Sequence, residues 1–118
     1  MKTLILGASP IQSRYSNIVT NRLVKAGHEV VLVGNRIGEI AGQPIQRTTE
    51  NVKDIHTVTL YLNEYNQKAY ENFILELKPK RVIFNPGAEN PKLMARLKAQ
   101  DIDAFEACTL VMLSSDLF

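Results

Sequence analysis

The sequence predicts a single doubly wound α/β domain, in which helices cover both faces of a mostly parallel sheet. Aliphatic and β-branched runs alternate along the chain with segments of helical apolar spacing, and this alternation is typical of parallel strands joined by right-handed crossovers. A length of 118 residues corresponds to one domain, and 45% hydrophobic residues are enough for one core. We therefore assign residues 1–118 to one domain with five to six strands.

Short runs bounded by turn residues are the expected strands. Glycine ends the first two runs, at Gly7 and Gly34, as expected where a buried strand turns into a loop. Pro44 limits the third run to a short edge strand, and residues 35–56 around it fit the alternation least well. With that run counted third, the spatial order is the Rossmann order, 3-2-1-4-5-6. In chain order the runs are Lys2–Leu6, Glu29–Val33, Pro44–Gln46, Thr57–Leu62, Arg81–Phe84 and Asp103–Glu106.

The expected helices have recognisable start and stop signals. Gly27 stops the first helix, Asn63 is a suitable N-cap for the second, and Pro79 ends it. Asn90 followed by Pro91 is the favoured order of cap and first helical residue. In chain order the helices are Ser13–Lys25, one that buries Tyr65, Ala69, Phe73 and Leu77, one that buries Leu93, Met94 and Leu97, and Thr109–Ser114.

Composition excludes several classes of protein. A net charge of +2 with 22% charged residues is too balanced for a protein that works by neutralising nucleic acid. No apolar run is long enough to span a membrane, and no signal peptide is expected at the start of the chain. The single cysteine, Cys108, excludes an internal disulfide and a cysteine-rich zinc site. We expect a cytoplasmic protein that binds neither nucleic acid nor membrane.

The sheet topology predicts where a ligand binds. In an open parallel sheet, ligands lie outside the carboxyl ends of the strands, where the strand order reverses. His28, His56 and the basic segment Lys78–Arg81 precede strands, so we place them at the opposite, amino edge. Imidazole chemistry is therefore not expected at the ligand crevice, and the basic segment is interpreted as a solvated turn.

The loop after the first strand carries the main binding signal. A glycine permits a tight turn, and the helix that follows offers free N–H groups and a positive dipole end to an anion. Serine hydroxyls and an arginine add donors suited to a pyrophosphate, although the loop is not a G-x-G-x-x-G motif. The alternative is an ordinary loop with serine capping. The candidate residues are Gly7, Ala8, Ser9, Ser13, Arg14, Tyr15 and Ser16.

The end of the second strand distinguishes between nucleotides. Sites for NAD place an acidic residue here, whereas sites for a phosphorylated ribose use an arginine. The strand ends at Gly34, Asn35 and Arg36, which favours CoA or NADP. The alternative is a surface arginine in a solvated loop.

Two further loops reach the same edge. The turn Asn85, Pro86 and Gly87 would line the path of an extended ligand arm. Cys108 follows the last strand beside the start of a helix, a position that lowers the pKa of a thiol. A mixed disulfide between Cys108 and the thiol of CoA is one hypothesis, and a packed apolar cysteine is the other.

Several of these segments together resemble the small standalone CoA-binding proteins, which are similar to the nucleotide-binding domain of the succinyl-CoA synthetase alpha subunit. The resemblance runs over nearly the whole chain. It implies that the first loop holds the CoA pyrophosphate, that Arg36 lies near the phosphates, and that Leu62, Asn63 and the turn at residues 85–87 flank the adenine or the pantetheine arm. The segments that carry the resemblance are Gly7–Ser9 with Ser13–Ser16, Gly27–Val31, Thr57–Leu62, Asn85–Gly87 with Glu89–Pro91, and Glu106–Leu113.

The synthetase's phosphohistidine has no counterpart here, so its ligase activity is not transferred. We expect non-catalytic binding of CoA or acyl-CoA, as a sensor, a carrier or a partner of an acyl-CoA enzyme, with a homodimer also open. The alternative is a small NADP-dependent oxidoreductase or NADP-binding regulator, in which Tyr61 or Tyr65 would have to donate the proton.

Overall fold

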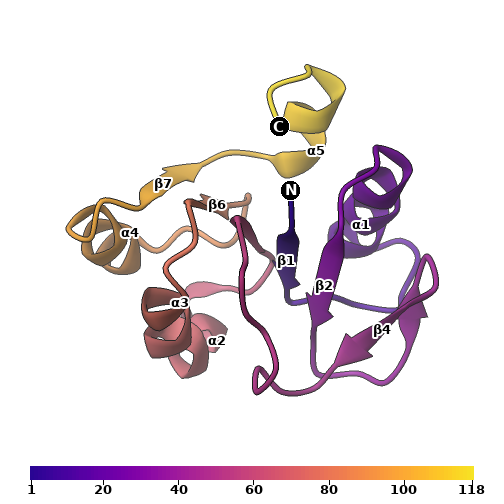
Figure 1. The fold of residues 1–118 in the computed structure, drawn as a ribbon, viewed down its shortest axis with the longest axis horizontal. Helices are drawn as coiled ribbons and strands as arrows, with labels where there is room; N and C mark the ends of the chain where they lie inside the picture. The colour runs from indigo at the N-terminus through magenta and orange to yellow at the C-terminus, as the bar shows by residue number, and fades with distance from the viewer.

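The computed structural model describes residues 1–118 and has a seven-stranded sheet at its centre (Figure 1). The spatial order is β3-β4-β2-β1-β5-β6-β7, and every pairing except β3 with β4 is parallel. Without β3, this is the predicted Rossmann order, which is confirmed. The strands are β1 (Thr3–Leu6), β2 (Val30–Val33), β3 (Glu39–Ile40), β4 (Gln43–Gln46), β5 (Thr57–Leu60), β6 (Arg81–Phe84) and β7 (Asp103–Glu106).

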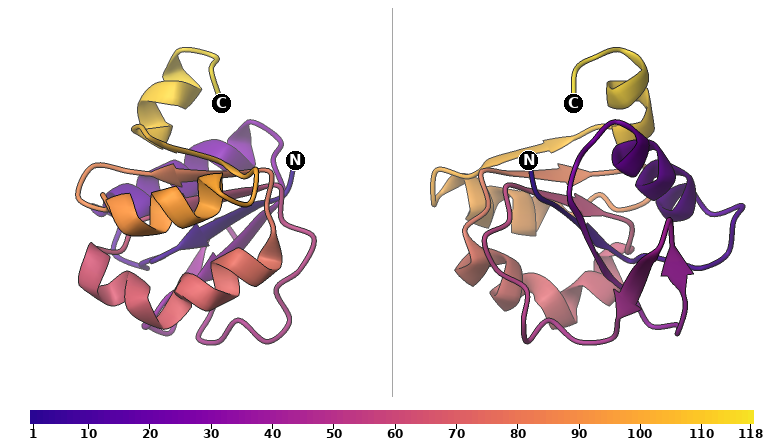
Figure 2. Two further views of the ribbon diagram at one scale, coloured as in Figure 1. Left: turned by 90° about the vertical axis from the view of Figure 1, so that its left-hand side faces the viewer. Right: turned by 45° about the vertical axis from the view of Figure 1, so that its right-hand side comes forward.

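Helices lie on both faces of the sheet, as Figure 2 shows. Helices α1 and α5 cover one face, and α2, α3 and α4 cover the other. No helix is both long enough and apolar enough to cross a membrane. The helices are α1 (Tyr15–Lys25), α2 (Glu64–Gln67), the 3₁₀ turn η1 (Lys68–Tyr70), α3 (Glu71–Leu77), α4 (Pro91–Lys98) and α5 (Thr109–Ser114).

The sheet separates two buried clusters, because successive side chains of a strand point to opposite faces. In β1, Leu4 and Leu6 belong to the larger cluster, beneath α3 and α4, whereas Ile5 belongs to the smaller one with Leu23 of α1. All of these side chains are fully buried. Burial on both faces explains why the strands read as continuous apolar runs.

The edge of the sheet differs from the prediction. The expected edge strand is present as β4, but a two-residue strand, β3, pairs with it in an antiparallel hairpin. The turn between them is Ala41–Gly42, and both residues have positive φ, at 52° and 79°. Such turns are usually signalled by Asn-Gly or Asp-Gly. The Ala-Gly pair is a weak signal, and the hairpin was therefore missed.

The second helix also differs from the prediction. A 3₁₀ turn divides it, and Tyr65 is 74% exposed instead of buried. Ala69 is exposed as well, while Ile74 and Leu75 are buried. The residue that turns inward is Gln67, whose side-chain amide donates to the carbonyl oxygens of Leu62 and Ala88 at 2.8 and 2.7 Å. The hydrogen bonds to these buried carbonyl oxygens offset the free-energy cost of burying the polar Gln67 side chain. Polar contacts therefore determine which face of this helix turns inward.

Both predicted asparagine caps are confirmed. The side chain of Asn63 accepts a hydrogen bond from the N–H of Asn66 at 2.8 Å, and that of Asn90 accepts from the N–H of Leu93 at 3.2 Å. The helix after Asn90 begins at Pro91, as expected. These caps fix the starts of α2 and α4 beside the carboxyl ends of β5 and β6.

Both histidines lie at the amino edge of the sheet, as predicted. The ring of His28 makes an edge contact with Phe118 at a centroid distance of 5.2 Å, and Nδ1 of His56 lies 2.8 Å from Oγ1 of Thr57. Burial lowers the pKa of each below 6.5, and the positive charges of Arg81 and the N-terminus lower it further. The folded protein therefore binds these protons less readily than the unfolded chain.

This difference predicts a pH dependence of stability. Well above pH 6.5 the histidines are neutral in both the folded and the unfolded state, so they do not change the free energy of unfolding there. As the pH falls below 6.5, the unfolded chain takes up protons first, and we expect the free energy of unfolding to decrease. Urea denaturation between pH 8 and pH 5 measures this. The double variant His28→Gln, His56→Gln should flatten the decrease, and an unchanged slope would contradict the prediction.

Candidate functional site

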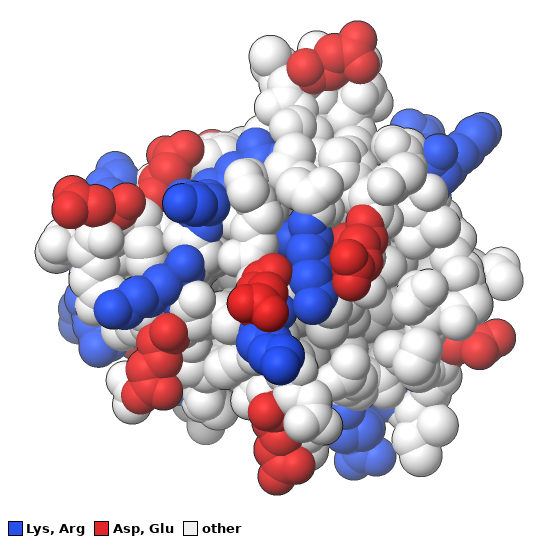
Figure 3. Space-filling view, viewed as in Figure 1, with Lys and Arg blue, Asp and Glu red and all other residues white.

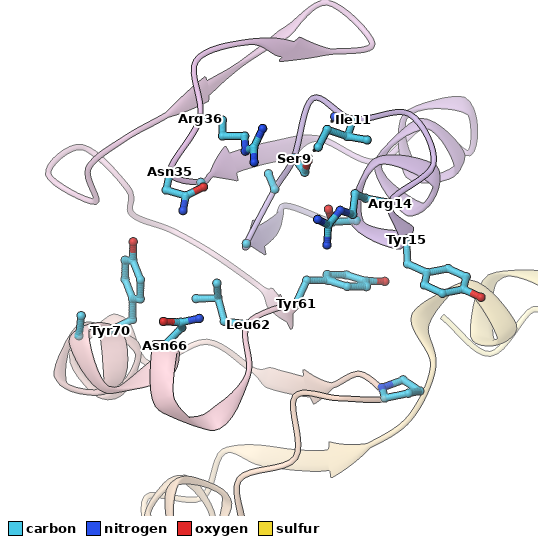
Figure 4. A pocket seen from close by; sticks show the side chains of 16 residues that line it. Ser9, Ile11, Arg14, Tyr15, Asn35, Arg36, Tyr61, Leu62, Asn66 and Tyr70 are labelled. Atoms are coloured by element: carbon cyan, nitrogen blue, oxygen red, sulfur yellow. Dashed lines mark hydrogen bonds between the residues drawn. The ribbon is translucent and has the colours of Figure 1, made fainter.

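A cavity of about 660 Å³ opens at the carboxyl ends of β1, β2 and β5 (Figure 4). Its position is the one predicted by the reversal of strand order, since β1 lies between β2 and β5. The lining residues are Gly7, Ala8, Ser9, Ile11, Arg14, Tyr15, Ser16, Gly34, Asn35, Arg36, Tyr61, Leu62, Asn66, Ala69, Tyr70 and Pro86.

The loop between β1 and α1 forms the floor of the cavity. Gly7 has φ of +100°, and a Cβ there would lie 2.9 Å from the backbone carbonyl of Tyr61. The N–H groups of Gly7 and Ala8 both donate to the carbonyl oxygen of Val33, at 2.9 and 3.0 Å. Glycine is therefore required for the turn and for close approach to β5, and these first amides are occupied by the protein itself.

The start of α1 has free donors. Asn17 and Ile18 donate to the carbonyl oxygen of Arg14, whereas the N–H groups of Tyr15 and Ser16 have no acceptor within the protein. A helix N-terminus with unsatisfied amides and a positive dipole end favours a bound anion. The free donors thus lie eight and nine residues further along the chain than Gly7.

The cavity is electropositive. Arg14 and Arg36 extend into it in Figure 4, and no lining residue is acidic. Neither arginine forms an ion pair, because the ion pairs of the protein are Lys2 with Glu29 and Arg96 with Glu71. Elsewhere, on the face seen in Figure 3, basic and acidic side chains are interspersed. The cavity therefore concentrates uncompensated positive charge.

The opposite wall is apolar and aromatic. Leu62, Ala69 and Tyr70 line it together with the amide of Asn66. Figure 4 shows Leu62, Asn66 and Tyr70 across from Asn35 and Arg36. Leu62 and Tyr70 are partly buried against the larger core cluster. The cavity thus joins a cationic wall to an aromatic one.

Tyr61 lines the cavity between these two walls. Burial raises the pKa of its hydroxyl to about 12, an effect that the neighbouring hydroxyls of Thr59 and Thr109 oppose in part. The phenol is therefore neutral at physiological pH, and its pKa lies far from the range suited to general acid–base catalysis.

Most of the predicted binding residues line this cavity. The structure brings together Gly7, Ala8, Ser9, Arg14, Tyr15, Ser16, Gly34, Asn35, Arg36, Leu62 and Pro86. It does not bring Ser13, Asn63, Asn85, Gly87 or Cys108 into the lining. Sequence reasoning missed Ile11, Asn66, Ala69 and Tyr70, and it considered Tyr61 only as a proton donor.

Two of the predicted residues outside the lining, Asn63 and Gly87, make local hydrogen bonds within the protein. Asn63 caps α2, and the N–H of Gly87 donates to the carboxylate of Glu89, at 3.0 and 3.2 Å to its two oxygens. Cys108 is a half-buried free thiol at the start of α5, outside the lining. Ser13 is exposed in the loop before α1.

Asn85 is a buried structural link and not a lining residue. It is 2% exposed. Its amide donates to Oγ1 of Thr59 at 2.7 Å and to the carbonyl oxygen of Leu60 at 2.9 Å, and its carbonyl accepts from the N–H of Thr109 at 2.9 Å. One side chain thus ties the ends of β5 and β6 to the start of α5.

Replacing Asn85 with alanine is expected to lower the free energy of unfolding by about 2 kcal/mol, because buried groups of Leu60 and Thr109 lose their partner. Chemical denaturation measures this loss. Asn66→Ala is the matched control, since the side chain of Asn66 is exposed and makes no hydrogen bond within the protein. Equal stabilities of the two variants would contradict the role of Asn85.

The chain is similar to a known protein family and to solved structures. A family model described as a CoA binding domain matches residues 1–114. A crystal structure of a protein described as uncharacterized is 48% identical, with a TM-score of 0.96 and coverage of 99% of this chain and 97% of that one. No curated protein matches the chain.

Two more distant structures share the fold. A protein from Thermus thermophilus is 22% identical with a TM-score of 0.88, covering 99% of this chain and 90% of its own. A hypothetical protein from Pyrococcus horikoshii is 21% identical with a TM-score of 0.85, and the coverage is 98% and 82%.

Proposed function

The chain belongs to the CoA binding domain family, and from this premise we propose that its cavity binds coenzyme A through the phosphates, as a binding protein and not as an enzyme. The observation that carries the proposal is that two arginines, Arg14 and Arg36, line one cavity in which no residue is acidic. A ligand with a pyrophosphate and a ribose phosphate supplies the negative charge that this cavity lacks.

The pyrophosphate is assigned to the start of α1. The free N–H groups of Tyr15 and Ser16 and the guanidinium of Arg14 belong to three consecutive residues, and all three residues line the cavity. Backbone amides at a helix start and an arginine fork together match the geometry of phosphate oxygens. The ribose phosphate is assigned to Arg36, which follows β2 and extends into the cavity.

A binding role is favoured over reduction of a substrate by NADPH. The lining contains neither histidine nor carboxylate, and the raised pKa of Tyr61 keeps its proton in place at neutral pH. In the cell, such a protein would act as a sensor, as a carrier, or as a partner of an enzyme that uses acyl-CoA.

Isothermal titration calorimetry with CoA, dephospho-CoA, NADP and NAD tests the proposal. We expect CoA to bind most tightly and dephospho-CoA to bind about tenfold or more weakly, since it lacks the phosphate assigned to Arg36. NAD is expected to bind weakest. Binding of NADP without binding of CoA would overturn the assignment, and so would turnover of NADPH with a panel of carbonyl substrates.

A further inference from the structure

The order of the groups in CoA gives the ligand a direction in the cavity. The ribose phosphate lies toward one end of the molecule, the pyrophosphate in the middle, and the thiol at the tip of the pantetheine arm. With the ribose phosphate at Arg36 and the pyrophosphate at the start of α1, the arm leaves past Tyr15. Figure 4 shows Tyr15 at the opposite end of the cavity from Asn35. An acyl group carried on the thiol therefore emerges beside Tyr15.

The interior next to this end of the cavity is closed to an acyl chain. Tyr61 points toward Tyr15 in Figure 4, and the hydroxyls of Thr59 and Thr109 neighbour its own. These two hydroxyls are buried and lie 2.8 Å apart, and Asn85 donates to Thr59 at 2.7 Å. An entering apolar chain would break these bonds and leave buried polar groups without partners. The acyl chain therefore has to lie on the surface.

Helix α5 presents apolar side chains to the surface beside this end. Its first residue is held there, because the N–H of Thr109 donates to Asn85 at 2.9 Å, and the helix packs beside α1 on the same face of the sheet (Figure 2). Thr109 is fully buried and Leu113 packs on the smaller core cluster. Leu110 and Val111 therefore lie on the flank and on the outer side of the helix, where Val111 is 59% exposed.

Tyr15, Leu110 and Val111 form what we call the apolar strip. All three belong to the first turn of α1 or α5, and both helices begin at the carboxyl edge of the sheet. Leu110 and Val111 pack in neither core cluster, and α5 contains no charged residue. Elsewhere the opening is bordered by charge, with Arg14 and Arg36 in the lining and the exposed Glu89 beyond β6. The strip is the part of the opening best suited to an apolar group.

The apolar strip is too small for a second copy of the chain. A stable dimer buries about 800 Å² on each partner. Helix α5 has six residues and is therefore only about 9 Å long, and the exposed polar residues Ser114, Ser115 and Asp116 follow the strip along the chain. An extended chain of eight carbons spans roughly the same 9 Å. The dimensions fit one alkyl chain.

We propose that the ligand of this site is an acyl-CoA thioester with an uncharged, apolar acyl group of medium length, which lies on the apolar strip. This inference rests on the proposed binding of CoA and names its substrate class. An acetyl group is too short to cover Leu110 and Val111. The terminal carboxylate of a succinyl group would lose water against these side chains without gaining a partner.

Calorimetry with CoA, acetyl-CoA, octanoyl-CoA and succinyl-CoA tests the inference. A chain that lies on a surface buries about one side of each methylene group. We therefore expect octanoyl-CoA to bind about 10- to 100-fold more tightly than acetyl-CoA. Acetyl-CoA and succinyl-CoA should bind about as tightly as CoA.

The double variant Leu110→Gln, Val111→Gln should lower the ratio of octanoyl-CoA to acetyl-CoA affinity by about tenfold, and Val111→Gln alone by about threefold. Glutamine keeps a high helix propensity. Leu117→Gln is the matched control, since Leu117 is 70% exposed beyond the far end of α5. The affinity for CoA should stay unchanged in all three variants, which also shows that they are folded.

A spectroscopic variant gives a second readout. The chain contains no tryptophan, so Val111→Trp introduces a single reporter on the apolar strip. Its fluorescence should shift to shorter wavelength with octanoyl-CoA, because the acyl chain excludes water from the indole, but not with CoA. Leu117→Trp should shift with neither ligand.

The outcomes separate this inference from the proposed function. Wild type that binds none of the four ligands contradicts both. Wild type that binds CoA and octanoyl-CoA equally tightly overturns the acyl assignment and leaves CoA binding in place. A preference for octanoyl-CoA that persists in the double variant, or a fluorescence shift of Leu117→Trp alone, would likewise overturn the assignment to the apolar strip.

Discussion

The double variant Arg14→Glu, Arg36→Glu is expected to bind CoA at least about 100-fold more weakly than wild type. Each arginine is assigned one charge-assisted contact with a phosphate, worth about 1.5–3 kcal/mol, and the two losses together exceed about 3 kcal/mol. Neither arginine has an ion-pair partner in the protein. We therefore expect little change in folding stability, and circular dichroism can check this alongside the calorimetry.

Lys53→Glu, Lys92→Glu is the control for overall charge. It makes the same change in net charge at exposed positions outside the cavity, so its CoA affinity should stay near that of wild type. The single variant Arg36→Glu should lose about 1.5–3 kcal/mol of CoA binding and much less of dephospho-CoA binding. An unchanged dissociation constant for CoA would instead assign Arg36 to the solvated loop.

Gly34→Ala has the largest expected effect on folding. A Cβ at this position would overlap the backbone carbonyl oxygen of Ala8 and lie 3.2 Å from Cγ2 of Ile45. Neither segment can withdraw easily, because Gly34 donates to the carbonyl oxygen of Gln46 at 3.0 Å and Ala8 donates to that of Val33 at 3.0 Å. We expect a loss of about 3 kcal/mol in the free energy of unfolding, measured by urea denaturation.

Gly42→Ala separates this clash from the general cost of replacing a glycine. A Cβ at Gly42 meets no atom within 4 Å, although its φ is +79°. The strain of a left-handed alanine costs about 1 kcal/mol, so Gly42→Ala should be clearly milder than Gly34→Ala. Equal losses would show that the contact with Ala8 relaxes. Ala8→Gly should not rescue Gly34→Ala, since the obstructing atom belongs to the backbone.

The sequence predicted the sheet well because glycine and proline separate runs that are buried on both faces. Gly7 and Gly34 end strands where the chain turns sharply or approaches a neighbouring strand closely. The hairpin before β4 was missed because its turn is Ala41–Gly42. That turn owes its conformation to the pairing of β3 with β4, and Ile40 is buried there at 3% exposure. This contact is not visible in local sequence.

The candidate site was predicted only in part, because the rule used for it places loops and not individual side chains. The rule on carboxyl ends places loops at one edge, and it correctly gathered Arg14 and Arg36 at one cavity. It does not say whether a polar side chain turns outward to a ligand or inward. Asn85 turns inward and bonds to Thr59, Leu60 and Thr109.

Tyr70 was not predicted to line the cavity because a 3₁₀ turn interrupts the second helix. The helical period extrapolated from Tyr65 gives the wrong face once the 3₁₀ turn intervenes. The available signal was Gln67, a polar residue three positions before an aromatic one, but its buried partners come from Leu62, Ala88 and Asn90. Two of these lie more than twenty residues away in the chain, beyond the reach of periodicity.

Both chain ends lie at the amino edge, where Met1 and Phe118 contact Arg81. A guanidinium to ring-centroid distance of 4.3 Å holds Phe118 there. A fluorescent reporter fused to either end, or a surface tether attached there, would leave the ligand opening facing the solution. The protein is therefore a suitable recognition element for an immobilised biosensor, in which the attachment chemistry does not obstruct ligand entry.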